Sequence, residues 1–478
     1  MKRFLPLLIA LALVMSLMVT LSACKKDTID DGENNNDNTE ENVQGGGGTM
    51  IDGIPDLDVT PVPQADPSSY VYYDDVPGAN GDENAKLQKF EFPSDKVVFL
   101  SHYEMDPPDG KRPSSELDIY QLKRETNVVP PDERLNKFIS MVMSNDAPDI
   151  FIYDFIPTLA TKGYLAPWNT YINFNDGVWA KIKSSLDNLK YKEHFYSCGI
   201  LPGRWDMVWY NINLFEEYGQ KTPLEYYREG NWNWDTFREC AKAMTIDIDQ
   251  DGSTDIYGGT IGSQFINTTG KDFITINSDG TATNNMGSPE IARAMQFYID
   301  LTVKDKCLYI GNDATDLFKT SRLAMYMSGA SLRSSISDSM IRTEMVFFVP
   351  LPKDPTTDKY YVYEGFGGSH LPMGAPNPQG AAAIQVGGRY DYIDQNPEYT
   401  DEEYYEYWDW SRSMDDFLWA EMYGEDKAPV LSTIGVFNLY EFWGDIWYRT
   451  TQGEPWSAIS AELFPRVQDV IDRAMDID

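Results

Sequence analysis

Four aspartates in one short segment have the spacing of a calcium-binding loop. The segment contains, in order, Asp247, Asp249, Asp251, Gly252 and Asp255. Carboxylates at alternate positions beside a glycine turn match the first nine places of an EF-hand loop, and Ca²⁺ prefers oxygen ligands. The twelfth place, where an EF-hand has a bidentate glutamate, is Gly258. The segment therefore predicts a structural Ca²⁺ site completed by other oxygens of the chain, and the alternative is a solvated acidic turn.

Carboxylates are also the groups with which a glycoside hydrolase would act, as a pair on either side of the scissile bond. The candidates, which lie next to predicted strand ends, are Glu104, Asp154, Asp206 and Glu364. No local motif marks two of them as a pair, and the sequence contains no His-Glu-x-x-His, Cys-x-x-Cys or Gly-x-Ser-x-Gly motif. We therefore expect a protein that is not an enzyme and has no organic cofactor, with a hydrolase as an alternative.

The first 24 residues have the pattern of a bacterial export signal. Lys2 and Arg3 precede an apolar run that ends in Leu21-Ser22-Ala23-Cys24, which resembles a lipobox. In a lipobox the cysteine receives the lipid and becomes the new N-terminus. We predict a signal peptide over residues 1–23, acylation of Cys24 by fatty acids such as palmitate, and a location on the outer face of the cell membrane. An uncleaved transmembrane anchor is the alternative.

Residues 24–92 are predicted to form an acidic, flexible tether. Residues 25–92 hold 16 acidic residues against four lysines, together with an asparagine run, four consecutive glycines and five prolines. Like charges and glycines keep such a chain extended and solvated. Its expected role is to hold a folded part away from the membrane, although residues 70–92 could instead add to that folded part.

Charge and cysteine content limit the remaining function classes. The chain has 39 basic and 75 acidic residues, a net charge of −36, so a nucleic-acid partner is excluded on electrostatic grounds. After Cys24 there remain Cys198, Cys240 and Cys307. Three is an odd number, so at most one disulfide can form, and Cys240 has the position of a core residue on a predicted helix.

Strands and helices alternate through the rest of the chain. The hydrophobic pattern predicts buried strands over 96–100, 149–153 and 208–210. Helices are predicted over 114–126, 134–144 and 234–244, the last capped by Asn233, with another opening at Pro289. This alternation favours an α/β fold with a largely parallel sheet.

Four groups of residues, in order over about 300 positions, resemble segments of one known family. They are Met143–Phe151; Trp209-Tyr210-Asn211 with Leu214-Phe215, Gly219 and Trp232–Phe237; Phe318-Lys319 with Leu323–Met325 and Gly329; and Phe347–Pro352 with Gly367-Gly368 and Asn377-Pro378. The sequence resembles the sugar-binding type of extracellular solute-binding proteins of bacterial ABC importers. This resemblance implies an α/β fold of two lobes, periplasmic-binding-protein-like (type II), with hinge crossings and a ligand cleft between the lobes.

The lobes expected from this resemblance are each formed by two parts of the chain. Residues 93–208 and 335–375 are assigned to the first lobe, and residues 209–334 and 376–478 to the second.

The resemblance also implies a ligand site at strand ends that face the cleft. Aromatic rings would contact the apolar faces of a sugar, and polar groups would bond its hydroxyls. The candidates by position are His102, Tyr103, Glu104, Tyr153, Asp154, Arg204, Trp205, Asp206, Gln264, Phe265, Glu364 and Phe366. Where the family commonly has a tryptophan after Gly329, this chain has Ala330 and Ser331. Arg333 could replace that contact by a polar one, and Trp443, with Trp447, could supply stacking.

The expected function is therefore capture of a carbohydrate, an oligosaccharide, for delivery to the permease subunits of an ABC transporter by a lipid-anchored monomer. The strong negative charge keeps a second alternative open, a receptor of the same fold for a peptide or a cation.

Overall fold

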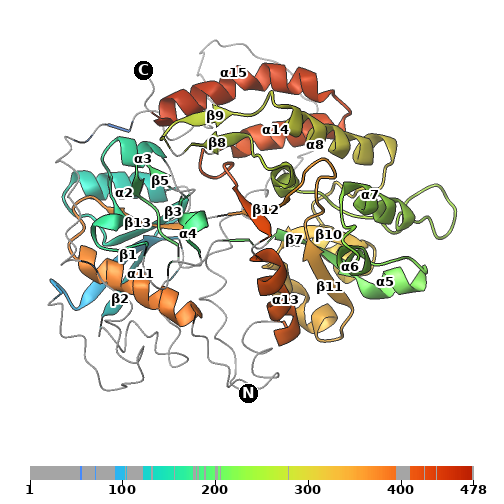
Figure 1. Ribbon diagram of the computed structural model, residues 1–478, viewed down its shortest axis with the longest axis horizontal. Helices are drawn as coiled ribbons and strands as arrows, with labels where there is room; N and C mark the ends of the chain where they lie inside the picture. The colour runs from blue at the N-terminus through green and yellow to red at the C-terminus, as the bar shows by residue number, and fades with distance from the viewer. Residues whose placement is uncertain are drawn as a thin grey trace, which may run out of the picture.

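The computed structural model describes most of the chain beyond residue 91. The described residues are 54, 55, 57, 70, 92–102, 104, 122–130, 133–154, 157–175, 179, 182–187, 190–199, 203–204, 206–277, 279–365, 367–393, 410–424, 426–437 and 439–475. The predicted signal peptide and Cys24 lie outside them, as do the candidate site residues Tyr103, Trp205 and Phe366. Two lobes lie side by side in Figure 1.

The first lobe is built on a five-stranded mixed sheet. Its strands in spatial order are β2 (Lys123–Val128), β1 (Lys96–Ser101), β3 (Ile150–Asp154), β13 (Gly367–Pro372) and β4 (Leu165–Ala166). β1 is parallel to β2 and β3, whereas β13 is antiparallel to β3 and β4. The longer helices of this lobe are α2 (Arg134–Met143) and α11 (Pro378–Ile393), with the short α3 (Pro157–Thr161) and α4 (Lys183–Asp187). The strands predicted over 96–100 and 149–153 are confirmed as β1 and β3.

The prediction of a helix over 114–126 is wrong for its last part, because residues 123–128 form β2. This strand pairs along its whole length with β1 and carries mostly polar side chains. An edge strand needs no apolar face, since backbone pairing with its neighbour supplies the interaction.

The second lobe contains an antiparallel sheet of β10 (Met325–Gly329), β7 (Asp206–Asn211) and β11 (Val346–Pro350). Alternate residues of β7 enter two different clusters: Val208 and Tyr210 join the main core, and Met207 and Trp209 a second cluster. The helices of this lobe are α5 (Ile212–Glu217), α6 (Pro223–Arg228), α7 (Trp234–Ala243), the 3₁₀ helix η6 (Ser263–Thr269), α8 (Pro289–Ile299), the π-helix η7 (Asp300–Lys304), α9 (Ala314–Lys319), α10 (Leu332–Ile336), the π-helix η8 (Ser337–Ile341), α13 (Arg412–Met422), α14 (Tyr440–Thr451) and α15 (Trp456–Met475).

Two-stranded pairs and one short helix complete the described elements. The pairs are β5 (Lys190–Tyr191) with β6 (His194–Phe195), β8 (Ile274–Ile276) with β9 (Ala282–Asn284), and β12 (Tyr360–Glu364) with β14 (Lys427–Leu431); the helix is the 3₁₀ helix η4 (Trp168–Thr170). The predicted cap of α7 is confirmed, since the Asn233 side chain accepts hydrogen bonds from the backbone amides of Asp235 and Thr236.

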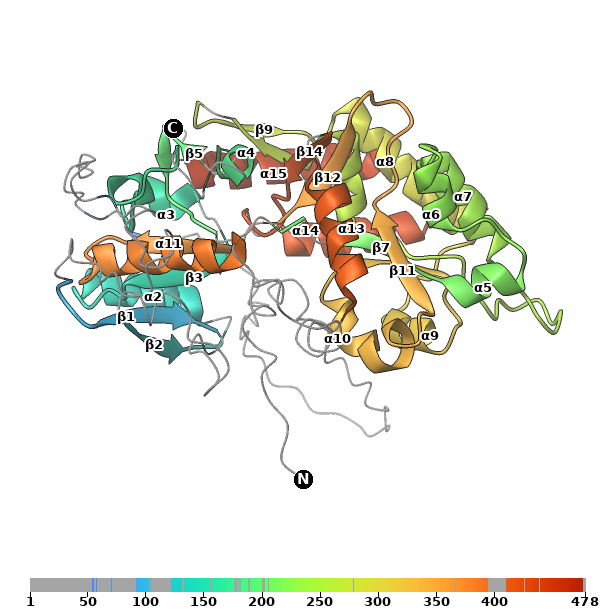
Figure 2. The same ribbon diagram turned by 60° about the horizontal axis from the view of Figure 1, so that its bottom comes forward.

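The lobe boundaries expected from the sequence need two corrections. Residues 346–350 were assigned to the first lobe, but β11 completes the sheet of the second lobe by pairing with β7. Residues 378–393 were assigned to the second lobe, but α11 packs on β1 in the first (Figure 2). Sheet pairing between distant segments decides both cases, and it leaves no local mark in the sequence.

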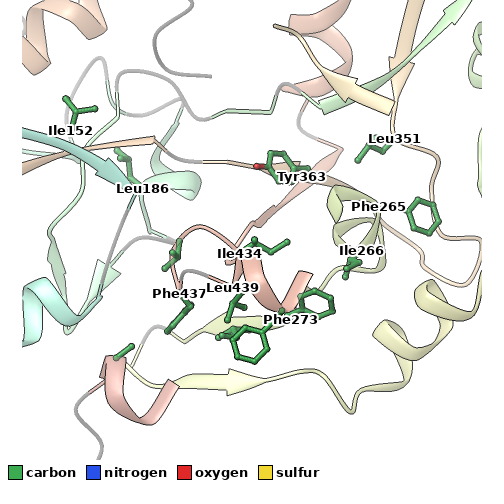
Figure 3. Close-up of a cluster of buried hydrophobic side chains, with 14 of the residues drawn as sticks. Ile152, Leu186, Phe265, Ile266, Phe273, Leu351, Tyr363, Ile434, Phe437 and Leu439 are labelled. Atoms are coloured by element: carbon green, nitrogen blue, oxygen red, sulfur yellow. The ribbon is translucent and has the colours of Figure 1, made fainter. Parts of the chain in front are cut away.

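The two lobes share one continuous hydrophobic core around the segments that cross between them. Figure 3 shows Ile434, Phe437 and Leu439, which follow β14, beside Phe273. The same core includes Ile152 of the first lobe. The crossing segments pair with each other, since the backbone amide of Gly203 donates to the carbonyl of Gly365 at 2.7 Å and the amide of Gly365 donates to the carbonyl of Gly203 at 2.9 Å. In two-lobe proteins, a few residues of such connecting segments absorb the backbone change of a hinge motion.

The C-terminal helix makes a further contact between the lobes. α15 packs against α8, β9 and α14 of the second lobe and against α3 of the first. The Thr158 hydroxyl on α3 donates to the carbonyl of Ala474 at 3.3 Å. Figure 1 shows α15 running above both lobes.

Candidate ligand-binding site

Three polar and aromatic side chains gather where β1 and β3 end in the first lobe. β1 and β3 are parallel neighbours, so His102, which follows β1, and Tyr153, near the end of β3, lie at the same edge of the sheet. Arg134, the first residue of α2, donates a guanidinium N–H to His102 Nδ1. Burial first, and then the Arg134 charge, lower the pKa of His102 to about 4. His102 is therefore neutral at pH 7, with its one ring proton on Nε2.

α2 covers the ring of Tyr153 on one side. Phe138 stacks on Phe151 with ring centroids 4.0 Å apart, and one helical turn earlier the Arg134 guanidinium carbon lies 4.4 Å from the centroid of the Tyr153 ring. Tyr153 is half-buried. A ligand that contacts Tyr153 would therefore meet the ring beside a cation. Arg134 was not among the sequence candidates, although its position four residues before Phe138 places it on the core-facing side of the predicted helix.

Asp206, at the start of β7 where the chain enters the second lobe, is hydrogen-bonded to the side-chain amide of Gln264. Gln264, in the first turn of η6, donates its side-chain N–H to Asp206 Oδ1 at 2.7 Å. Both side chains are half-buried. Burial raises the pKa of Asp206 to about 6, although the Gln264 hydrogen bond acts in the opposite direction. Both residues stay candidates for ligand contact.

The raised pKa of Asp206 predicts a pH-dependent stability. The pKa of Asp206 is about 6 in the folded protein, against 3.8 for an ordinary aspartate. Its protonation therefore stabilises the fold below about pH 4, and this contribution is lost as the pH rises through 6. Without ligand, the Asp206→Asn variant should exceed the unmodified protein in unfolding free energy by about 3 kcal/mol at pH 7.5 and by about 1 kcal/mol at pH 4.5. Urea unfolding at the two pH values measures the difference. Equal pH dependence in the two proteins would contradict the assignment.

Two predicted ligand residues instead form a buried ion pair between the crossing segments. Arg204 Nε lies 2.9 Å from Glu364 Oε2, and the side chains are 8% and 0% exposed. The Ser185 hydroxyl of α4 donates to the same carboxylate oxygen at 2.6 Å. The Tyr423 hydroxyl, at the end of α13, accepts from the Arg204 backbone amide at 3.3 Å. The ion pair is thus hydrogen-bonded to α4 of the first lobe and to the end of α13 of the second. The expectation that Glu364 contacts a ligand is corrected, because its side chain has no exposed surface.

Two further candidates are buried against aromatic side chains. Phe265 packs against both Trp234 and Phe297, with ring centroids 4.8 and 5.5 Å away, and is 2% exposed. This corrects its assignment as a ligand contact, because the ring belongs to the core. The Arg333 guanidinium carbon lies 4.2 Å from the centroid of the Trp410 ring, and Arg333 is buried. The cation thus has an aromatic partner from the chain itself.

The remaining candidates are placed less directly. Trp443 is half-buried on α14 and lies against Phe273 and Trp447. Glu104 is exposed. The backbone of Asp154 pairs with Gly367 across β3 and β13. Tyr103, Trp205 and Phe366 lie outside the described residues, so they stay predictions.

Three of the four aspartates in the predicted calcium loop come together. Asp247, Asp249 and Asp255 each offer a carboxylate oxygen, and these oxygens lie within 4.8 Å of one another. The backbone amide of Gly252 donates to Asp247 Oδ2 at 2.9 Å, and that of Ile248 donates to Asp255 Oδ2 at 2.8 Å. Asp251 instead accepts from the backbone amide of Ser253. The oxygen-only trio fits a hard cation such as Ca²⁺.

The cysteines Cys198, Cys240 and Cys307 are buried free thiols, so the disulfide that the sequence left open between two of them does not form here. Burial raises the pKa of Cys240 to about 12 and that of Cys307 to about 11. Both thiols are therefore protonated at neutral pH, which suits core residues and not nucleophiles.

Two α/β lobes joined by paired crossing segments, with polar and aromatic groups at strand ends, define the class of two-lobe binding proteins. Residues 123–386, over half of the chain, match the family described as bacterial extracellular solute-binding protein. The chain belongs to this family, and the resemblance recognised in the sequence is confirmed. No curated protein matches this sequence. In the described part of the chain, every helix is too short or too polar to cross a membrane.

Solved structures of low sequence identity share the fold. An ABC substrate-binding protein from Listeria monocytogenes, in complex with cycloalternan, is 15% identical with a TM-score of 0.54, covering 80% of this chain and 99% of its own. The cyclic alpha-maltosyl-1,6-maltose binding protein from Arthrobacter globiformis is 15% identical with a TM-score of 0.54, covering 79% and 98%. UgpB from Mycobacterium tuberculosis, in complex with glycerophosphocholine, is 15% identical with a TM-score of 0.54, covering 80% and 99%. The expected two-lobe fold is confirmed.

Proposed function

We propose that this protein is a lipid-anchored, extracytoplasmic receptor that captures an oligosaccharide between its lobes and delivers it to the permease of an ABC transporter. The observation that carries the proposal is membership of the solute-binding family over residues 123–386 in a chain with two lobes and a paired crossing. Proteins of the same fold were solved with cycloalternan and with other oligosaccharides, which favours a carbohydrate ligand here.

The mechanism we propose is closure of the lobes on the ligand. His102 and Tyr153 of the first lobe would supply a donor and a ring, and Asp206 and Gln264 of the second lobe would bond sugar hydroxyls. The crossing at Gly203 and Gly365 would act as the hinge. Binding and release would leave the ligand chemically unchanged, so no group in this scheme acts as an acid, a base or a nucleophile.

Attachment to the membrane is proposed from the N-terminal sequence. The lipobox that ends at Cys24 predicts acylation, and a lipid-anchored monomer could present its ligand repeatedly to one permease. Mass spectrometry of the protein isolated from its own membranes tests this directly: an acylated N-terminal cysteine supports the anchor, and an intact residue 1 contradicts it.

A ligand panel tests the proposed function. The protein without its signal peptide is mixed with oligosaccharides, peptides and polyamines, and the melting temperature is measured for each. A saturating ligand at 100 to 1,000 times its Kd should add about 3–4 kcal/mol of stability. Stabilisation by an oligosaccharide that is recovered unchanged supports the proposal. Stabilisation only by peptides or polyamines would point to the alternative receptor, and turnover of a chromogenic glycoside would point to a hydrolase.

We also propose that Asp247, Asp249 and Asp255 hold a structural Ca²⁺. At a Kd of about 10⁻⁴–10⁻³ M, 10 mM Ca²⁺ should raise the unfolding free energy by about 1.5–3 kcal/mol. The Asp249→Asn variant should lose most of this gain, whereas Asp279→Asn, in another exposed loop, should keep it. Identical melting in Ca²⁺ and in a chelator would contradict the metal site and would leave the ligand proposal intact.

A further inference from the structure

A short segment inside the predicted tether is packed onto the first lobe. Ile54 is 6% exposed and belongs to the main hydrophobic core, against which Leu57 also packs. The hydroxyl of Tyr164, a fully buried side chain before β4, donates to the carbonyl of Pro55 at 3.0 Å. This corrects the prediction that the whole of residues 24–92 is a flexible tether.

The segment also supplies a hydrogen-bond donor to a carbonyl at the end of helix α3. Carbonyls in the last turn of a helix have no partner within the helix. The backbone amide of Leu57 donates to the carbonyl of Lys162, the residue after α3, at 3.2 Å. This backbone hydrogen bond, the Tyr164 hydrogen bond and two apolar side chains therefore attach the segment to one place on the lobe.

The local sequence explains why Ile54 and Leu57 can dock on the lobe. Residues 24–53 contain eight acidic and two basic residues and few apolar ones, so that stretch has little surface to bury. At Ile54, Pro55 and Leu57 two large aliphatic side chains flank a proline, whose fixed φ lowers the entropy cost of ordering the backbone.

The docking place lies next to a contact between the lobes. The amide of Lys162 donates to the carbonyl of Thr158 at 2.9 Å, and the Thr158 hydroxyl donates to Ala474 of α15 at 3.3 Å. The docked segment, α3 and the end of α15 are thus connected by consecutive hydrogen bonds.

We infer that Ile54, Pro55 and Leu57 form a docking segment that fixes the N-terminal tether to the first lobe at α3. The predicted tether before the docking segment is then residues 24–53, 30 residues instead of 69. Its root-mean-square span is about 30 Å instead of about 45 Å for a flexible coil. If Cys24 is acylated, the first lobe is the membrane-attached lobe. The docking itself does not depend on the lipid or on the ligand.

Hydrogen exchange on the ligand-free chain from residue 24 to residue 478 tests this inference. Peptides that cover residues 54–57 should exchange at least tenfold more slowly than peptides around residue 43, because Leu57 is hydrogen-bonded and packed. Ile54→Asp should remove this protection. Tyr164→Phe, which deletes one hydroxyl and keeps the ring, should speed exchange by about two- to tenfold. Val43→Asp, an equal change upstream, should have no effect.

Two results would overturn the inference. One is exchange at residues 54–57 as fast as at residue 43 in the unmodified chain, or unaltered by Ile54→Asp. The other is protection that disappears on dilution, since the segment would then dock on a second copy of the chain. Neither result bears on the ligand panel, so failure of this inference is distinguishable from failure of the proposed function.

Discussion

Replacing Glu364 by alanine is expected to lower the free energy of unfolding by about 3–5 kcal/mol, because a buried cation then loses its partner. Glu364 Oε2 accepts hydrogen bonds from Arg204 Nε at 2.9 Å and from the Ser185 hydroxyl at 2.6 Å, and the Glu364 side chain is fully buried. Removing it leaves Arg204 charged and almost fully buried. Urea unfolding at pH 7 measures the loss.

The matched control is an exposed ion pair. Lys96 and Glu125 pair between β1 and β2 with side chains 48% and 53% exposed, so Glu125→Ala should cost less than about 1 kcal/mol. The double variant Arg204→Met with Glu364→Leu should recover much of the stability lost in Glu364→Ala, because no charge is left unpaired. A loss below 1 kcal/mol for Glu364→Ala would mean that the ion pair does not hold the crossing segments together.

Truncating Phe265 is expected to cost about 3–5 kcal/mol of unfolding free energy, the range for a buried phenylalanine changed to alanine. Phe265 contacts the rings of both Trp234 and Phe297, and the cavity left by its removal would be lined by both. This expectation separates a core residue from a ligand contact, for which stability would change little and affinity much.

An exposed aromatic residue provides the comparison for Phe265. Tyr448 on α14 is 66% exposed, so Tyr448→Ala should change stability by no more than about 0.5 kcal/mol. Thermal unfolding of the two variants in parallel decides the case. Unchanged stability and lost ligand binding in Phe265→Ala would show that Phe265 is a ligand contact, as the sequence predicts, and not a core residue.

Features with a local cause were predictable from the sequence. The Asn233 cap, the apolar runs of β1 and β3 and the gathering of Asp247, Asp249 and Asp255 all depend on residues close together in the chain. Short-range spacing fixes which side such residues face, so pattern alone was sufficient.

Features that depend on distant partners were not predictable. Position after a predicted turn marked Phe265 as a ligand candidate, but Phe297, 32 residues later, covers it. Glu364 was a candidate because it lies just before Gly367-Gly368, and its partner Arg204 is 160 residues away. Ile54 and Leu57 lie in a polar, proline-rich stretch, and only the tertiary structure provides the surface that buries them.

The central claim is that the lobes close on a ligand and release it unaltered. Its most direct test is the distance between spin labels at Lys137→Cys on α2 and Glu239→Cys on α7, both exposed positions in different lobes. The three native thiols within the lobes are buried, and Cys24→Ser removes the fourth. We expect the distance to shorten when the oligosaccharide that stabilises the protein most is added, and the sugar to be recovered intact. An unchanged distance with bound sugar, or a chemically altered sugar, would contradict the account.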